Sequence, residues 1–153
     1  MLKAREKDNL VVSKFLRGGI MIKVLWIVAQ IQFCQSHAAY LREYGDIEVT
    51  FVEYANEALD LLAPGHPFKA IIVDPWICEG ESTGAKRDPF TNDQRIIGLE
   101  LIERIPCECK IPVISYNEAN EEIAQQAKTM GITSLGNIPY PSEFHEALQS
   151  LIH

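Results

Sequence analysis

The sequence predicts an α/β fold, in which a parallel β-sheet lies between two layers of helices. Unbroken apolar runs at 24–29 and 70–73 are typical of strands that are covered on both faces. Segments with helical spacing of apolar residues separate the predicted strands along the chain. With 153 residues the chain is long enough for one domain with a core of its own, so we expect a single domain.

The first half of the chain provides two strands and two helices of this domain. Residues 24–29 form the expected first strand, and the segment 36–44 is predicted to be a helix that Gly45 stops. Residues 47–51 alternate between apolar and polar, which is typical of a strand at the edge of a sheet. Asn56 is expected to cap the next helix, which closes before the Pro-Gly pair at 64 and 65.

The second half continues the alternation of strands and helices. Its expected elements are a strand at 70–73, a helix at 97–105, a strand at 111–114, a helix at 120–130, a strand at 132–136 and a helix at 141–152. Five strands that alternate with five helices require right-handed crossovers in a parallel sheet. Together with the early edge strand, this predicts a flavodoxin-like three-layer α/β/α sandwich with strand order 2-1-3-4-5.

Charge and composition exclude several classes of function. Charged residues make up 23% of the chain, and no apolar run is long enough to span a bilayer, so we expect no membrane association. Residues 1–20 carry five Lys or Arg and two Asp or Glu, whereas the remainder carries nine and 19. A domain of net charge −10 is poorly suited to binding nucleic acid.

The cysteine pattern indicates a reduced, cytoplasmic protein. The four cysteines follow no secretory signal. Zinc sites usually combine two Cys or His pairs, and the pair Cys107 and Cys109 has no second pair at comparable spacing. We therefore expect no metal site at these cysteines.

Two segments stand outside the regular pattern. Residues 1–20 are expected to be a flexible N-terminal extension, so that a chain beginning at Met21 keeps its fold. A polar insertion at about 79–95 follows the central strand, and connections of this length tend to be lids or disordered stretches. Because apolar residues flank the insertion, we expect its ends to be anchored and the segment to cover Asp74.

Asp74 is the first candidate for a functional residue. It ends the predicted central strand, and ligands bind at the carboxyl ends of the strands in open α/β sheets. The alternative is that Asp74 and Pro75 only terminate this strand. Both interpretations are compatible with the local sequence.

Several segments of the chain resemble the receiver domain of CheY-like response regulators in two-component signalling. The resemblance covers about residues 22–152 and rests on the strand end Val73-Asp74, the helix start Gly98-Leu99-Glu100-Leu101-Ile102, the strand Ile111-Pro112-Val113-Ile114, and Gly131 followed by Ile138-Pro139-Tyr140-Pro141-Ser142-Glu143. It implies that Asp74 occupies the position of the aspartate that accepts a phosphoryl group from a histidine kinase.

The chain departs from the family where the phosphorylation chemistry resides. Two adjacent acids after the first strand, which help to hold Mg²⁺ in the family, correspond to Val28, Ala29 and Gln30. The lysine that precedes the proline after the fifth strand corresponds to Ile138. The hydroxyl at the end of the fourth strand falls near Asn117, with Ser115 as the alternative in a shifted register, and the aromatic residue on the fifth strand is replaced by Leu135.

The resemblance and these departures together predict a pseudo-receiver, which is not an enzyme, binds no cofactor and acts through a protein partner. The partner is expected to be a signalling protein or a histidine kinase, or a second copy that pairs through the face formed by 120–130, 133–136 and 141–152. The first alternative is a phosphorylatable receiver, whose Mg²⁺ ligands would come from Glu79, Glu81, Asp88 or Asp93. The second is a flavodoxin-like binding protein or enzyme, although no phosphate loop follows the first strand. A thiolate or metal site built from Cys34, His37 and Cys78 is a further alternative to their being partly buried helix residues.

Overall fold

The computed structural model describes residues 20–77, 80, 96–118 and 121–152. The predictions for the N-terminal extension before Ile20, for Cys78, for the acids of the insertion and for its cover over Asp74 lie outside these residues. Within the described part of the chain, no helix is long and apolar enough to cross a bilayer.

A five-stranded parallel sheet forms the centre of the domain. Its strands are β1 (Ile22–Ile27), β2 (Ile47–Val52), β3 (Ala70–Val73), β4 (Val113–Ser115) and β5 (Thr133–Ser134), in the order β2-β1-β3-β4-β5. All neighbouring strands are parallel, which confirms the predicted order. The alternating strand β2 lies at the edge, as its pattern predicts.

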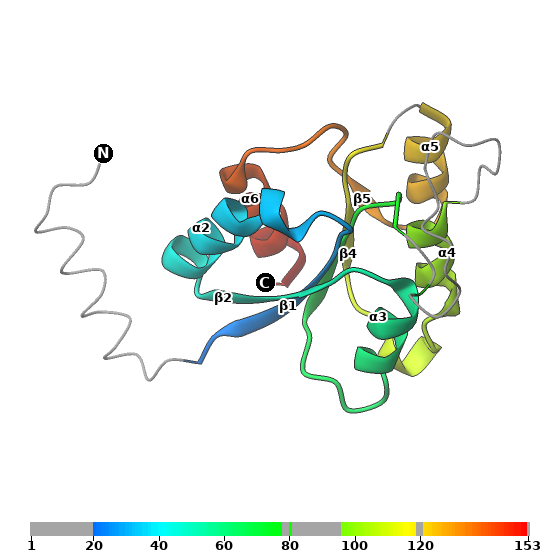
Figure 1. Ribbon diagram of the computed structural model, residues 1–153, viewed down its shortest axis with the longest axis horizontal. Coiled ribbons are helices and arrows are strands. Elements are labelled where there is room, and N and C mark those ends of the chain that lie inside the picture. Colours follow the sequence, from blue (N-terminus) through cyan, green and yellow to red (C-terminus); the bar gives the residue numbers. More distant parts are fainter. Residues whose placement is uncertain (1–19, 78–79, 81–95, 119–120, 153) are drawn as a thin grey trace, which may run out of the picture.

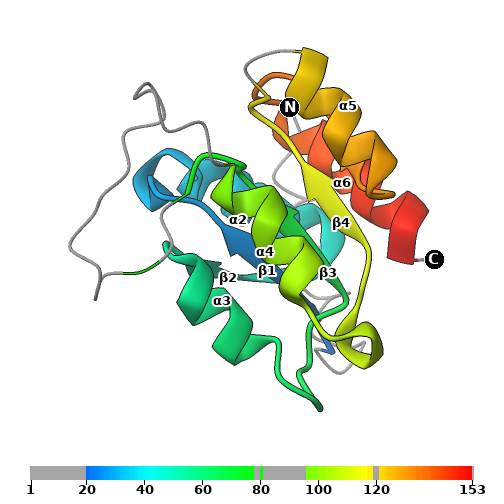
Figure 2. The same ribbon diagram turned by 90° about the vertical axis from the view of Figure 1, so that its right-hand side faces the viewer.

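Helices cover both faces of the sheet. They are α2 (Gln35–Gly45), α3 (Ala55–Leu61), α4 (Ile97–Arg104), α5 (Glu121–Thr129) and α6 (Pro141–Ile152), with short 3₁₀ turns η1 (Ile31–Phe33) and η3 (Cys107–Cys109). Figure 1 shows α2 and α6 on one side of the sheet and α3, α4 and α5 on the other. Figure 2 presents the second side, with β4 passing between α4 and α5. The three-layer arrangement is therefore confirmed.

The central strand β3 connects the two halves of the core. All four of its residues are completely buried, which is the reason for its unbroken apolar sequence. Because side chains alternate along a strand, Ile71 and Val73 belong to the core cluster with α3 and α4. Ala70 and Ile72 belong to the cluster with α2 and α6. Each buried Ile contributes roughly 1.5–3 kcal/mol through its removal from water.

The predicted helix cap at Asn56 is wrong. The helix α3 begins one residue earlier, after Tyr54 in an extended conformation, and no side-chain cap forms. Asn56 instead lies against Gly80, where an added Cβ would stand 2.5 Å from its Nδ2 atom. A contact between distant parts of the chain has thus overridden the local preference of Asn for a cap.

The helix α2 ends at Gly45 as predicted, although the left-handed residue that follows it is Asp46. Gly45 is the last helical residue, and Asp46 adopts the left-handed conformation, with φ 53°, that ends the helix. The space at Gly45 is tight, because an added Cβ would lie 3.0 Å from His145 Nε2 and 3.0 Å from Ile47 Cδ1, so these two side chains would have to shift.

Candidate functional site

Asp74 leaves the sheet at the carboxyl end of β3, between β1 and β4. Its backbone N–H donates a 2.9 Å hydrogen bond to the carbonyl of Ile27, which continues the ladder with β1 by one more residue. The side chain is only partly buried, whereas Val73 before it is completely buried. The structure therefore places Asp74 at the edge of the sheet where the sequence predicts a functional site.

Both carboxylate oxygens of Asp74 accept hydrogen bonds. The backbone N–H of Trp76 donates to Oδ1 at 2.9 Å, which forms a local turn of the kind that Asp favours. The side-chain amide of Asn117 donates to Oδ2 at 3.2 Å. Trp76 Nε1 in turn donates to the carbonyl of Asn117 at 3.1 Å, which completes a ring of three hydrogen bonds. Burial raises the pKa of Asp74, and the bonds from Trp76 and Asn117 oppose that rise.

Asn117, which follows β4, bonds Asp74, whereas Ser115 in β4 does not. Ser115 is completely buried, and its hydroxyl has no hydrogen-bond partner among the described residues. Asn117 lies two residues later in the left-handed conformation, with φ 57°, which Asn tolerates better than most residues. Of the two candidates for this position, Asn117 is the one that contacts Asp74. An amide replaces the hydroxyl that the resemblance leads one to expect.

The stretch that follows β1 offers no carboxylate to Asp74. Val28 is buried in the core cluster with Cys34 and Tyr116, whereas Ala29 and Gln30 are exposed. No group of three His, Cys, Asp or Glu side chains in the described segments could hold a metal ion. A hard divalent cation prefers several oxygen ligands, so the described side chains alone do not fit Mg²⁺.

The position of the family's lysine is occupied by an exposed apolar residue. Ile138 is 69% exposed, in the connection between β5 and α6. Pro139 beside it is fixed by a 2.9 Å hydrogen bond between its carbonyl oxygen and His37 Nε2. Leu135, at the position of the family's aromatic residue, packs against the core cluster below α6. No described Lys or Arg forms a hydrogen bond with Asp74.

A buried aromatic group lies below the site. Trp26 Nε1 donates a 3.0 Å hydrogen bond to the hydroxyl of Tyr116, and Cys34 Sγ lies 3.9 Å from the same hydroxyl. Burial raises the pKa of Tyr116, and the nearby charge of Asp74 raises it further. Burial also raises the pKa of Cys34, so its thiol stays protonated at neutral pH. Cys34 is thus a buried residue of the core cluster with Trp26 and Tyr116, and its raised pKa disfavours the thiolate that a nucleophile requires.

One residue at this edge has no counterpart among the sequence predictions. Glu118 is only 8% exposed, and neither carboxylate oxygen has a hydrogen-bond partner among the described residues. Its backbone N–H donates to the carbonyl of Gly136 at 3.1 Å, which holds the residue at the end of β4. A glutamate between Asn117 and a predicted helix is expected at the surface, so no sequence signal identifies it.

Gly98 lets helix α4 approach the end of β3 closely. A Cβ at this position would lie 2.6 Å from the carbonyl oxygen of Asp74 and 2.7 Å from the Cα atom of Pro75. Both atoms belong to the backbone, so neither can move aside as a flexible side chain could. The close packing of α4 therefore helps to fix the backbone that carries the Asp74 carboxylate.

Comparisons with solved structures find many similar proteins. A response regulator receiver domain from Methanospirillum hungatei is 16% identical, with a TM-score of 0.64, and the alignment covers 86% of this chain and 93% of that one. The chemotaxis response regulator CheY4 of Vibrio cholerae is 24% identical, with a TM-score of 0.59 and coverage of 86% and 99%. A Burkholderia pseudomallei response regulator described with a phosphorylated aspartic acid and a calcium ion is 20% identical, with a TM-score of 0.60 and coverage of 86% and 66%.

The other two comparisons return nothing. No protein-family model matches the sequence, and no curated protein matches it. The similarity therefore rests on the arrangement of strands and helices, with identities too low to carry more than the fold. On that basis the chain has the fold of the CheY-like receiver domains of response regulators.

Proposed function

We propose that this chain is a receiver-like signalling domain that acts by binding a protein partner, without Mg²⁺-dependent phosphorylation of Asp74. The observation that carries this proposal is that the described groups bonded to the Asp74 carboxylate are uncharged. Its two oxygens accept hydrogen bonds from the Trp76 backbone and the Asn117 amide. Exposed Ala29 and Ile138 stand where the resemblance leads one to expect an acid and a lysine.

The chemistry of phosphoryl transfer explains why these replacements matter. Charge on the transferred phosphoryl group must be stabilised by cations held in fixed positions. In the hydrogen-bonded group of Asp74, Trp76 and Asn117, the only carboxylate available to a Mg²⁺ ion is that of Asp74. One of its two oxygens already accepts a hydrogen bond from the Asn117 amide. Among the described residues, the site therefore lacks both the metal ligands and the lysine that would make Asp74 an efficient acceptor.

Exposed apolar side chains near the site indicate where a partner would bind. Phe33, Ile138 and Tyr140 are 68%, 69% and 76% exposed. The hydrogen bond between His37 and Pro139 joins the segment after β1 to the connection that carries Ile138 and Tyr140. Apolar and aromatic side chains that remain exposed on a small domain are typical of interaction surfaces.

We place the partner surface on the β5–α6 connection and the adjoining face of α5, β5 and α6. A signalling protein or a histidine kinase is the proposed partner, and a second copy of the chain that pairs through the same face is its alternative. The charge balance of the domain makes an acidic or nucleic-acid partner unfavourable.

Phosphorylation of the full chain provides the test of the proposed function. We expect incubation with acetyl phosphate and Mg²⁺ to leave the intact mass unchanged, as for an Asp74→Asn variant treated in parallel. A CheY-type receiver in the same reaction verifies the phosphodonor. An added mass of one phosphate that is lost in Asp74→Asn would instead establish a phosphorylatable receiver.

A further inference from the structure

A cavity lies at the edge of the sheet opposite Asp74. It has a volume of about 250 Å³ and opens between the end of α4 and the segment that follows α5. Val113 and Ile132, at the starts of β4 and β5, form its floor together with Ile102 and Ile105. Because the strands are parallel, their first residues lie at the edge away from Asp74, so this cavity is separate from the site described above.

Apolar atoms make up somewhat more than half of the cavity's lining, and they are concentrated on its floor. The four floor residues are at most 8% exposed, whereas Ile111, Pro112 and Met130 at the rim are partly exposed. An engineered apolar cavity of about 150 Å³ can bind benzene, and drug-sized ligands occupy pockets of about 300–1,000 Å³. A cavity of this volume therefore suits a single ring or short alkyl chain with a small polar group attached.

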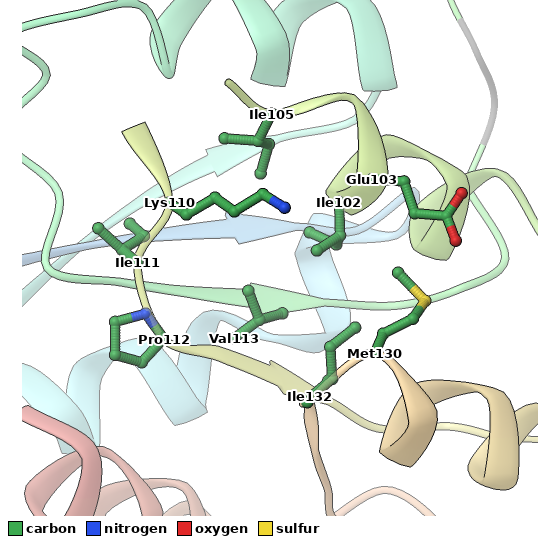
Figure 3. Close-up of a pocket in the computed structure, with 10 residues that line it drawn as sticks. Ile102, Glu103, Ile105, Lys110, Ile111, Pro112, Val113, Met130 and Ile132 are labelled. Atoms are coloured by element: carbon green, nitrogen blue, oxygen red, sulfur yellow. The ribbon is translucent and has the colours of Figure 1, made fainter. Parts of the chain in front are cut away.

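Two charged side chains border this apolar surface. In Figure 3 the side chain of Lys110 extends across the cavity, with its ammonium group directed toward Ile102. The carboxylate of Glu103 lies beyond Ile102 and points away from the Lys110 ammonium group. Neither side chain forms an ion pair with another described residue. The cavity thus presents one free cation above an apolar floor, which is the arrangement that an apolar carboxylate complements.

We propose that this cavity binds a small monocarboxylate with an aromatic or short aliphatic body. The apolar body would lie on Val113, Ile132 and Ile102, and the carboxylate would accept a charge-assisted hydrogen bond from Lys110. Met130 is unbranched and partly exposed, so it can adjust to bodies of different shape. Glu103 lowers the affinity for the anion and favours ligands that direct a single carboxylate toward Lys110.

A methyl-labelled sample of the full chain and the ligand 4-phenylbutanoate provide the test. We expect the methyl signals of Met130, Ile132 and Ile102 to shift in a saturable manner, with a dissociation constant of about 0.1–1 mM, as is typical of a ligand of this size. Lys110→Gln should weaken binding about fivefold, because one partly exposed charge pair is lost. Glu103→Gln should strengthen it about twofold at low salt.

Matched controls separate this site from general attraction to lysines or to apolar surface. Lys128→Gln removes an exposed lysine in the last turn of α5, outside the cavity, and should leave the affinity unchanged. The neutral amide 4-phenylbutanamide should bind the unaltered chain more weakly than the acid does. Lys110→Gln should bind the amide and the acid equally well. The proposal is overturned if the three methyl groups do not shift at about 10 mM ligand, or if Lys110→Gln and Lys128→Gln bind equally.

Discussion

The side-chain amide of Asn117 donates a 3.2 Å hydrogen bond to Asp74 Oδ2 across the ends of two adjacent strands. The amide stabilises the carboxylate without adding a charge, in contrast to a lysine or a metal ion. Asn117 can reach Asp74 because its backbone has left the extended conformation, with φ 57°. Asn117 therefore provides both the left-handed backbone conformation at this position and a hydrogen bond to the Asp74 carboxylate. Substitutions of Asn117 can measure the two contributions separately.

Replacement of Asn117 should destabilise the domain in two separable steps. Asn117→Gly removes the hydrogen bond to a charged group, at a cost of about 1–2 kcal/mol in the free energy of unfolding, and adds the entropy cost of ordering a glycine, but it introduces no strain at a positive φ. Asn117→Ala removes the same bond and also forces a Cβ-bearing side chain into a left-handed conformation, which adds about 1 kcal/mol. Urea unfolding of both variants measures the two costs. Equal stability of the two variants would show that the conformation of Asn117 carries no strain.

The pH dependence of stability should report the buried charge of Asp74. Burial is the largest influence on this carboxyl and raises its pKa, so the protonated form is favoured in the folded protein. The stability that follows from protonation is complete below the pKa of the unfolded chain and is lost as the pH rises through the raised pKa of the folded state. Asp74→Asn removes this loss. We expect the difference in the free energy of unfolding, Asp74→Asn minus the unaltered chain, to be more positive at pH 7 than at pH 4. The opposite trend in urea unfolding would contradict a raised pKa of Asp74 in the folded state.

The arrangement of the sheet could be predicted because its signals are local. The buried run of β3 and the alternation in β2 report directly how many faces each strand has covered. The start of α3 was less predictable, because Asn56 contacts Gly80 from a distant part of the chain and forms no cap. Single-residue signals such as a cap-forming side chain cannot report such contacts.

The candidate site was predictable only in part for the same reason. The position of Asp74 follows from the end of an apolar run. Its bond to Asn117 depends on a left-handed residue 43 positions away, and no sequence pattern marks that conformation. The burial of Glu118 depends likewise on the packing of the whole edge. The ring of hydrogen bonds among Asp74, Trp76 and Asn117 therefore depends on the tertiary structure and could not be predicted from the sequence.

Substitution of Glu118 should stabilise the protein. This carboxylate is 8% exposed and has no hydrogen-bond partner among the described residues, so its burial is unfavourable. Glu118→Met keeps an unbranched side chain of similar length and should raise the free energy of unfolding at pH 7 by about 1 kcal/mol. Glu118→Gln, which remains polar, should have a smaller effect. A loss of stability in both variants, measured by thermal or urea unfolding, would show that the carboxylate is paired.

Restoration of the missing charges should make Asp74 a phosphoryl acceptor. In the parallel register Ile27 pairs with Val73, and Ala29 follows Ile27 by two residues, so Ala29 lies near the carboxyl end of β3. Ala29→Asp would place an additional carboxylate near Asp74, and Ile138→Lys would return a cation to the β5–α6 connection. Together these groups supply the metal ligand and the positive charge that phosphoryl transfer requires.

We expect the double variant Ala29→Asp/Ile138→Lys to gain one phosphate in intact mass after incubation with acetyl phosphate and Mg²⁺. The gain should disappear with EDTA and in the triple variant that also carries Asp74→Asn. Both substituted residues are exposed, so the fold should tolerate them, and the near-ultraviolet circular dichroism spectrum checks this. If the double variant folds and stays unphosphorylated, the Asn117 bond to Asp74 becomes the next feature to remove. In that case Ala29 and Ile138 do not account for the lack of phosphorylation, and a further Asn117→Thr substitution would measure how much the amide contributes.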